Sequence, residues 1–283
     1  MAVDMALISQ LEDKAADIRE KIIDLTVIAG GGHIGGALSM VEILVALYYY
    51  SLSLDPANPE WPERDRFILS KGHGALGLCP VLADRGYFSE ELMSNFNGLN
   101  SPFGMHPDMH KIPGIEMSTG SLGHGLSIAV GCALAAKLDK ASWRTFCLLG
   151  DGELDEGMVW EAAMSASKFQ LGNLVAVVDR NGFSLDGPTE EIMPLEPLKD
   201  KWTSFGWNVM EIDGNNMAEV LTAFELLSAS PSNQPQCIIA KTIKGKGVSF
   251  MENMAEWHYG GLDDEKAEEI KGKIEIARKG RRC

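Results

Sequence analysis

The segment LLGDGELDEGM, residues 148–158, places a group of carboxylates directly after an apolar run. The run ends in Gly150-Asp151-Gly152, and the acids that follow are Glu153, Asp155 and Glu156. Carboxylates this close together repel one another unless hydrogen bonds or a cation compensate their charge. The spacing therefore raises the question of what neutralises them.

Three kinds of site match parts of this sequence. A calcium loop is excluded, because Glu156 stands where the loop needs its Gly and Ala162 where it needs its Glu. The segment GGGHIG, residues 30–35, matches a dinucleotide fingerprint, but a helical pattern precedes it where a strand is required. A β-α-β unit over residues 145–181 is the interpretation that fits.

In a β-α-β unit the two parallel strands end side by side, at the edge where ligands of open sheets bind. Asp151 ends the first strand, and Asn181 follows the second after about 30 residues, the length of one crossover. Their oxygens suit Mg²⁺ or Ca²⁺ shared with phosphate oxygens, and Gly152 allows the backbone to approach those phosphates. A structural turn with acids at a helix N-terminus is the alternative; the spacing of Asn181 favours the cation site.

The elements that must position these groups alternate along the chain. Apolar spacing predicts helices over 9–28, 121–138, 156–169, 216–228 and 264–279, and Ser39 is expected to cap a further helix through MVEILVALYYY, residues 40–50. Apolar runs predict strands over 66–70, 145–149, 174–179, 208–212 and 237–242.

These strands are apolar along their whole length, which predicts a doubly wound, mostly parallel α/β sheet with helices on both faces. We expect a single domain over residues 1–283, with an N-terminal helical extension over about residues 1–60. Because residues 121–138 are rich in Gly, Ala and Ser, another element is expected to pack very close to that helix.

Composition narrows the possible partners. The chain has 283 residues, a net charge of -15 and 45% hydrophobic residues, which allows a sizeable core. The acidic surface argues against nucleic acid and against a membrane as partner. The start lacks a basic signal segment, and residues 40–50 are too short to span a bilayer. The five cysteines show no C-x-x-C spacing, which indicates reduced thiols and a cytoplasmic location.

Several segments together resemble the N-terminal part of the transketolase family. GGHIGGALS resembles the family's Gly-His segment, LSKGHGALG its Ser-x-Gly-His segment, MHPD its Gly-His-Pro-Glu segment and STGSLGHGLSIAVG its Thr-Gly-x-Leu-Gly segment. GDGELDEG and DRNGFSLDG are similar to the two halves of the thiamine diphosphate and Mg²⁺ motif, and KTIKGKG with WHYGG closes the domain. The match runs in order from about residue 10 to residue 270.

The resemblance implies a thiamine diphosphate-binding fold and a role for each matching residue. Asp151, Asn181 and the backbone carbonyl of Phe183 would hold Mg²⁺, for which Ca²⁺ or Mn²⁺ could substitute. The cofactor-binding residues would be His73, Gly120, Leu122, Gly152, Asn181 and His258, with Gly120 and Leu122 against the rings. The catalytic residues would be His33, His73, His106, His258 and Glu156. The imidazoles would bind the sugar and carry protons, whereas Glu156 would lie at a subunit interface.

Two residues depart from the family's pattern. Ile34 follows the first histidine where transketolases commonly carry Pro, and Lys71 stands in the Ser-x-Gly-His segment. Both are expected to alter the choice of substrate without affecting cofactor binding. No role follows for His110 or His124.

The resemblance also implies a partner, because the family's second domain has no counterpart in this sequence. That domain supplies the glutamate that activates the cofactor and most arginines that bind sugar phosphates. We therefore expect the N-terminal subunit of a split transketolase, which transfers a two-carbon ketol unit from a ketose to an aldose. It would be active only with a separate C-terminal subunit, in an α2β2 assembly.

Two alternatives remain open for the function. One is a half-subunit of a related enzyme such as 1-deoxyxylulose-phosphate synthase, and the other is a non-catalytic regulator that binds thiamine diphosphate. For the assembly, the helix over 121–138 and the apolar segment 40–50 are expected to provide the surfaces that pack between subunits.

Overall fold

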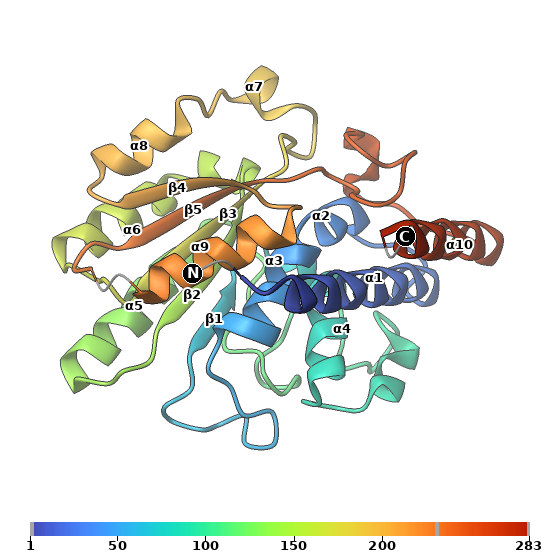
Figure 1. Ribbon diagram of the computed structural model, residues 1–283, viewed down its shortest axis with the longest axis horizontal. Coiled ribbons are helices and arrows are strands. Elements are labelled where there is room, and N and C mark those ends of the chain that lie inside the picture. The colour runs from blue at the N-terminus through green and yellow to red at the C-terminus, as the bar shows by residue number, and fades with distance from the viewer. Residues whose placement is uncertain (1–2, 230–231, 282–283) are drawn as a thin grey trace.

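Five parallel strands form one sheet in the computed structural model, which describes residues 3–229 and 232–281 (Figure 1). The order across the sheet is β1 (Arg66–Leu69), β2 (Thr145–Gly150), β3 (Leu174–Arg180), β5 (Gln236–Lys241) and β4 (Asn208–Asp213). All neighbouring strands are parallel. The predicted α/β fold is therefore confirmed, and each predicted strand is present to within one residue at either end.

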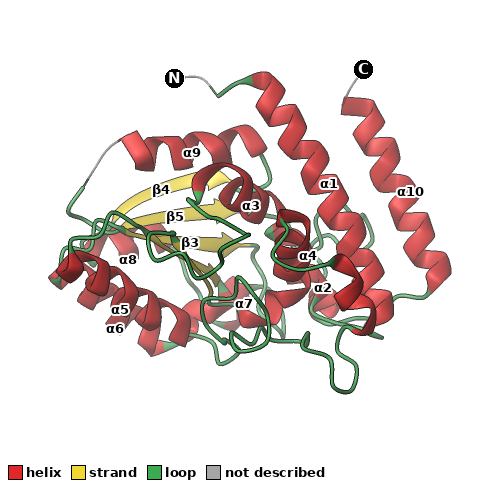
Figure 2. Ribbon diagram, turned by 90° about the horizontal axis from the view of Figure 1, so that it is seen from below, coloured by secondary structure: helices red, strands yellow, loops and turns green. Residues whose placement is uncertain are grey.

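Helices cover both faces of the sheet (Figure 2). In β3, Val175 and Val177 belong to one apolar cluster and Ala176 and Val178 to the other. The first cluster includes residues of α1 (Met5–Ile28), α2 (Ile34–Ser39), α3 (Val41–Ala46), α4 (Ala75–Arg85), α9 (Met217–Ala229) and α10 (Asp264–Arg281). The second includes residues of α5 (His124–Asp139), α6 (Gly157–Lys168) and α8 (Leu198–Ser204). Because both faces are covered, successive residues of the central strands are apolar.

The long predicted helices are present as α1, α6, α9 and α10, and the one predicted from residue 121 begins at His124. The short helices α7 (Thr189–Ile192) and α8 were not expected from the pattern. The close approach expected at α5 is confirmed at Gly125, where a Cβ would lie 2.3 Å from Ser70 Oγ. Glycine is needed here because the end of β1 leaves no room for a side chain.

The prediction that Ser39 caps a helix is wrong. Ser39 is the last residue of α2, and its Oγ donates to the Gly36 carbonyl and, at 2.6 Å, to Asp179 Oδ2. The segment after it divides into α3, which begins at Val41, and a π-helical turn over Leu47–Ser51. Met40 is the residue that precedes α3, and no side chain caps its first turn, because Ser39 still belongs to α2 and its hydroxyl is directed to Asp179.

The prediction that residues 40–50 form a surface between subunits is also wrong for most of that segment. Every residue from Met40 to Leu47 is buried inside this chain, and Tyr48 is only 3% exposed. The segment packs against α1, α4 and α9. The outer face of α5, in contrast, leaves Leu138 exposed, so its place in an interface stays a prediction.

The structure also describes the cysteines and the apolar length of the helices. Cys79, Cys147 and Cys237 are buried free thiols, Cys132 is a half-buried one, and Cys283 lies outside the described residues. Within residues 3–229 and 232–281, no helix is long and apolar enough to cross a membrane.

Candidate active site

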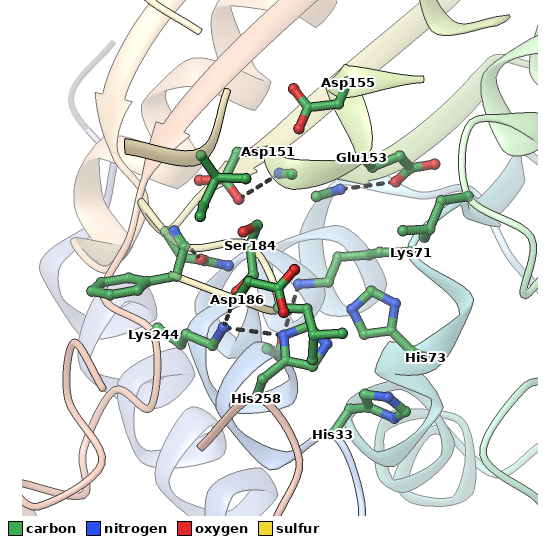
Figure 3. Close-up of a pocket in the computed structure, with 18 of the residues that line it drawn as sticks. His33, Lys71, His73, Asp151, Glu153, Asp155, Ser184, Asp186, Lys244 and His258 are labelled. Carbon is green, nitrogen blue, oxygen red and sulfur yellow. Dashed lines mark hydrogen bonds between the residues drawn. The ribbon is translucent and has the colours of Figure 1, made fainter. Parts of the chain in front are cut away.

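A cavity of about 410 Å³ lies at the carboxyl edge of the sheet, where β1, β2, β3 and β5 end (Figure 3). Among its lining residues are most of those singled out from the sequence: His33, His73, His106, Gly120, Leu122, Asp151, Gly152, Asn181, Phe183 and His258. Glu156 is the exception, since it is exposed beside the start of α6 and does not line the cavity. The fold thus brings together residues from segments that are far apart in the chain.

Asp151 and Asn181 lie side by side because β2 and β3 are paired in parallel, with Gly150 opposite Asp179. Asp151 Oδ1 accepts from the Gly152 amide at 2.9 Å, and Oδ2 accepts from the Gly182 amide at 2.6 Å. The carboxylate therefore joins the two turns that follow the strands. Gly182 adopts a φ of +83°, which favours glycine at this position.

The Asp151 carboxylate is only 1% exposed and is incompletely compensated. Arg180 Nη1 lies 3.0 Å from Oδ2. Even so, burial and the nearby charge of Asp179 raise the pKa of Asp151 to about 6. A cation beside this carboxylate would favour its charged form.

The other acids of the GDGELDEG segment have separate environments. Glu153 is 2% exposed, and its carboxylate accepts from the amides of Gly123 and Gly150 and from the Ser70 hydroxyl. Asp155 and Glu156 are exposed. The acids therefore differ in what stabilises their charge: Asp151 has two amides and Arg180, Glu153 has three neutral hydrogen-bond donors, and Asp155 and Glu156 face solvent. No role for Glu153 followed from its place in the sequence.

Two lysines also reach the cavity, and neither was assigned a role in cofactor binding from the sequence. Lys71 Nζ pairs with Asp179 Oδ2 at 2.5 Å and donates to the Gly36 carbonyl at 3.0 Å, and both side chains of the pair are buried. Lys244 Nζ donates to the Ser184 carbonyl at 3.0 Å and lies 3.1 Å from His258 Nδ1.

Lys244 forms no ion pair with any carboxylate of the described residues, although it is 1% exposed. Burial and the charge of Lys71 lower the pKa of Lys244 to about 8. An anion in the cavity would supply the missing counter-charge. The sequence feature that could have pointed to Lys244 is its position just after β5, the strand that neighbours β3.

Four imidazoles line the same cavity. The ring centroid of His33 lies 5.0 Å from that of His73, 5.4 Å from that of His258 and 6.4 Å from that of His106. His33 Nδ1 is buried and has no hydrogen-bond partner among the described residues. His110 and His124 are exposed and do not line the cavity.

Three of these imidazoles are held neutral. Burial, with neighbouring imidazoles and lysines, lowers the pKa of His33 to about 4, of His73 to about 2 and of His258 to about 3. A neutral imidazole has one nitrogen that donates and one that accepts. The cavity therefore offers both kinds of partner to hydroxyl and carbonyl oxygens.

This arrangement suits a cation and a polyanion bound together. A metal ion would have Asp151 and oxygens such as Asn181 Oδ1 as ligands, with phosphate oxygens completing its shell. The described residues contain no group of three or more His, Cys, Asp or Glu side chains placed to hold a metal ion. A site that uses one carboxylate, an amide and a backbone carbonyl does not need such a group.

Comparisons with known proteins show one family and one fold. Residues 11–279 match the family described as "Transketolase, thiamine diphosphate binding domain". The chain is 42% identical over 262 residues to one subunit of the apulose-4-phosphate transketolase of Phocaeicola vulgatus, and the match covers 93% of this chain and 92% of that protein. It is 46% identical over 255 residues to one subunit of the 6-deoxy-6-sulfo-D-fructose transketolase of a Clostridium species, covering 90% and 92%.

A similar structure is that of the transketolase of Pichia stipitis in complex with sedoheptulose-7-phosphate. It superposes with a TM-score of 0.88 at 30% identity, covering 94% of this chain but 41% of that protein. The chain thus spans about two fifths of the length of that transketolase and nearly all of the two subunits.

Proposed function

This chain belongs to the transketolase family, and from that premise we propose that it is the thiamine diphosphate-binding subunit of a two-chain transketolase. The observation that carries the proposal is one cavity in which a buried carboxylate, four imidazoles and a buried lysine with no acidic partner among the described residues converge. The reaction would transfer a two-carbon ketol unit from a ketose donor to an aldose acceptor.

The residues of the cavity fit thiamine diphosphate with Mg²⁺, or with Ca²⁺ or Mn²⁺ in its place. Asp151, Asn181 and the Phe183 carbonyl would hold the metal. The diphosphate would meet Gly152, His73, His258 and Lys244, and Gly120 and Leu122 would lie against the rings. A Cβ at Gly152 would come within 3.2 Å of Ser184, so a side chain there would be crowded and glycine leaves the backbone accessible. When bound, the cofactor stabilises carbanion character in the substrate.

The imidazoles would bind and orient the substrate. Because His33, His73 and His258 are neutral, they can donate to a carbonyl oxygen or accept from a hydroxyl at neutral pH. The unpartnered Nδ1 of His33 supports a role in contacting the sugar. His106 would act with them from the exposed side of the cavity. Glu156, exposed in the single chain, would be covered by another subunit.

The partner would be a C-terminal subunit that supplies the glutamate activating the cofactor. The two relatives named as subunits, which this chain matches nearly end to end, support this division. We propose that residues 1–283 form the single cofactor-binding domain, including the helical extension over about residues 1–60, and that two copies of each chain assemble in the cytoplasm.

The substrate would be a ketose with an anionic group at its far end. One relative is named for apulose-4-phosphate and another for a 6-deoxy-6-sulfo ketose, which carries a sulfonate instead of a phosphate. The family match and these names favour transketolase over the related synthase and over a non-catalytic regulator.

Reconstitution tests the proposal. The chain is coexpressed with candidate C-terminal transketolase subunits, and ketose phosphates and sulfonates are offered with an aldose acceptor. We expect turnover that requires thiamine diphosphate, a divalent metal and both chains. Light scattering should give a mass of two copies of each. Cofactor binding without turnover of any donor would favour the regulator, and the absence of cofactor binding would refute the proposal.

A further inference from the structure

The proposed function assigns no role to Asp179, a fully buried carboxylate beneath the cavity. It is the penultimate residue of β3, between Gly150 of β2 and Ala240 of β5, and it is 0% exposed. Buried carboxylates are retained when several donors satisfy them. The donors that contact Asp179 therefore indicate which side chains it positions.

Four side chains donate to Asp179, and each comes from a different segment that borders the cavity. Oδ2 accepts from Lys71 Nζ at 2.5 Å, from Ser39 Oγ at 2.6 Å and, more weakly, from Asn181 Nδ2 at 3.4 Å. Oδ1 accepts from the Thr242 hydroxyl. Lys71 and Asn181 line the cavity, whereas Ser39 and Thr242 do not.

The contact with Asn181 sets which end of its amide faces the cavity. An amide has a donating nitrogen and an accepting oxygen, and rotation by half a turn exchanges them. Asn181 Nδ2 faces Asp179, while Oδ1 accepts from the Phe183 amide at 3.1 Å. A carboxylate only accepts, so it disfavours the rotated amide, whose oxygen would face it. The orientation that remains leaves Oδ1 on the side of Phe183 and the metal site.

We propose that Asp179 is a positioning residue for the metal site, which orients the Asn181 amide and anchors the Lys71 ammonium at the base of the cavity. This inference rests on the proposed function, because it concerns the metal that Asn181 would hold. Groups that orient metal ligands from behind commonly change metal affinity by about 10- to 100-fold when they are replaced.

The test compares Asp179→Leu with Thr242→Val in the full chain, assembled with its partner and saturated with thiamine diphosphate. Mn²⁺ binding is followed by electron paramagnetic resonance, and thermal unfolding is measured in parallel without metal. Leucine keeps the approximate size of the side chain but removes both accepting oxygens, so the Asn181 amide loses the contact that fixes its orientation. We expect the Mn²⁺ Kd to rise about 10- to 100-fold.

Thr242→Val is the matched control, because it removes a hydrogen bond from the same carboxylate, at the oxygen that Asn181 does not contact. Its Mn²⁺ Kd is expected to stay within about twofold of that of the unmodified chain, whatever its effect on unfolding. If Asp179→Leu lowers the unfolding temperature and leaves the Kd unchanged, the role is merely structural and the inference is overturned.

Asp179→Leu leaves Lys71 buried without a counter-ion, and this can prevent folding. The double variant Lys71→Met/Asp179→Leu removes both charges and is measured against Lys71→Met alone, which retains the Asp179–Asn181 contact. We expect weaker Mn²⁺ binding in the double variant; equal affinities would overturn the inference. If the unmodified complex binds no Mn²⁺, the proposed function fails instead, so the two failures are distinguishable.

Discussion

Lys244→Met should change stability and cofactor binding in opposite directions. The lysine is buried beside Ser184 and His258 with no acidic partner among the described residues, and burial lowers its pKa to about 8. Its charge therefore destabilises the cofactor-free chain. The same charge would stabilise the complex with a diphosphate.

The magnitude follows from the pKa and the contacts. A fall in the pKa from 10.5 to about 8 corresponds to roughly 3 kcal/mol against the charged form in the folded state. Losing the donation to the Ser184 carbonyl offsets about 1–2 kcal/mol of this gain. We expect the cofactor-free variant to be more stable by about 1–2 kcal/mol at pH 7.

The effect should depend on pH with a definite sign. Below pH 8 the lysine is charged in both the folded and unfolded states, and the full cost is present in the unmodified chain. As the pH rises from 8 toward 10.5, the folded state releases its proton first, so the unmodified chain recovers stability relative to Lys244→Met. Urea unfolding at several pH values measures this difference.

Binding should respond in the opposite sense. Loss of a charge-assisted contact to phosphate costs about 1.5–3 kcal/mol, or roughly 10- to 150-fold in the Kd for thiamine diphosphate. Calorimetry with the partner present measures it. Lys246→Met is the control, because Lys246 lies two residues away and does not line the cavity. The reasoning is refuted if Lys244→Met binds thiamine diphosphate as tightly as the unmodified chain does. It is also refuted if the cofactor-free variant is clearly less stable than the cofactor-free unmodified chain.

Three further predictions concern the site and the helix beside it. Asp151→Ala removes the proposed charged metal ligand, and calorimetry with the partner present should show thiamine diphosphate affinity lowered by at least about tenfold; unchanged binding would contradict the assignment. The isolated chain should show no transketolase activity, and enzyme-like turnover by it would exclude a split enzyme. Gly125→Ala should destabilise the chain by about 1–3 kcal/mol, because its Cβ would lie 2.3 Å from Ser70 Oγ. Gly131→Ala, on the open side of the same helix, should stabilise it by about 0.5–1 kcal/mol in urea unfolding, and equal effects of the two would contradict this.

The sequence alone was sufficient for the class of fold and for the pair of polar residues at the edge of the sheet. Uninterrupted apolar runs alternating with helical patterns indicate a covered parallel sheet, whatever the details of packing. Asp151 and Asn181 could be placed together because one crossover separates them, and parallel strands must end at the same edge. Both inferences depend on local pattern and chain connectivity, which a sequence contains.

The resemblance to the family pointed to the four histidines, but the local sequence pattern could not predict that they lie close together. His33, His73, His106 and His258 come from four separate segments, and the folded chain decides that their rings share one cavity. For the same reason the apolar segment 40–50 was misjudged. A segment that is apolar on all sides looks alike whether it packs inside its own domain or against a partner.

Only the tertiary structure decided which charges are buried and what neutralises them. The sequence does not distinguish Asp179, Glu153 and Lys244 from other charged residues near strand ends or turns. Their burial depends on elements far away in the chain. The Ser39 hydroxyl was expected to begin a helix but is bonded to Asp179, 140 residues away. Electrostatic energies depend on distance and on exclusion of water, and both are set by packing between segments rather than by their order.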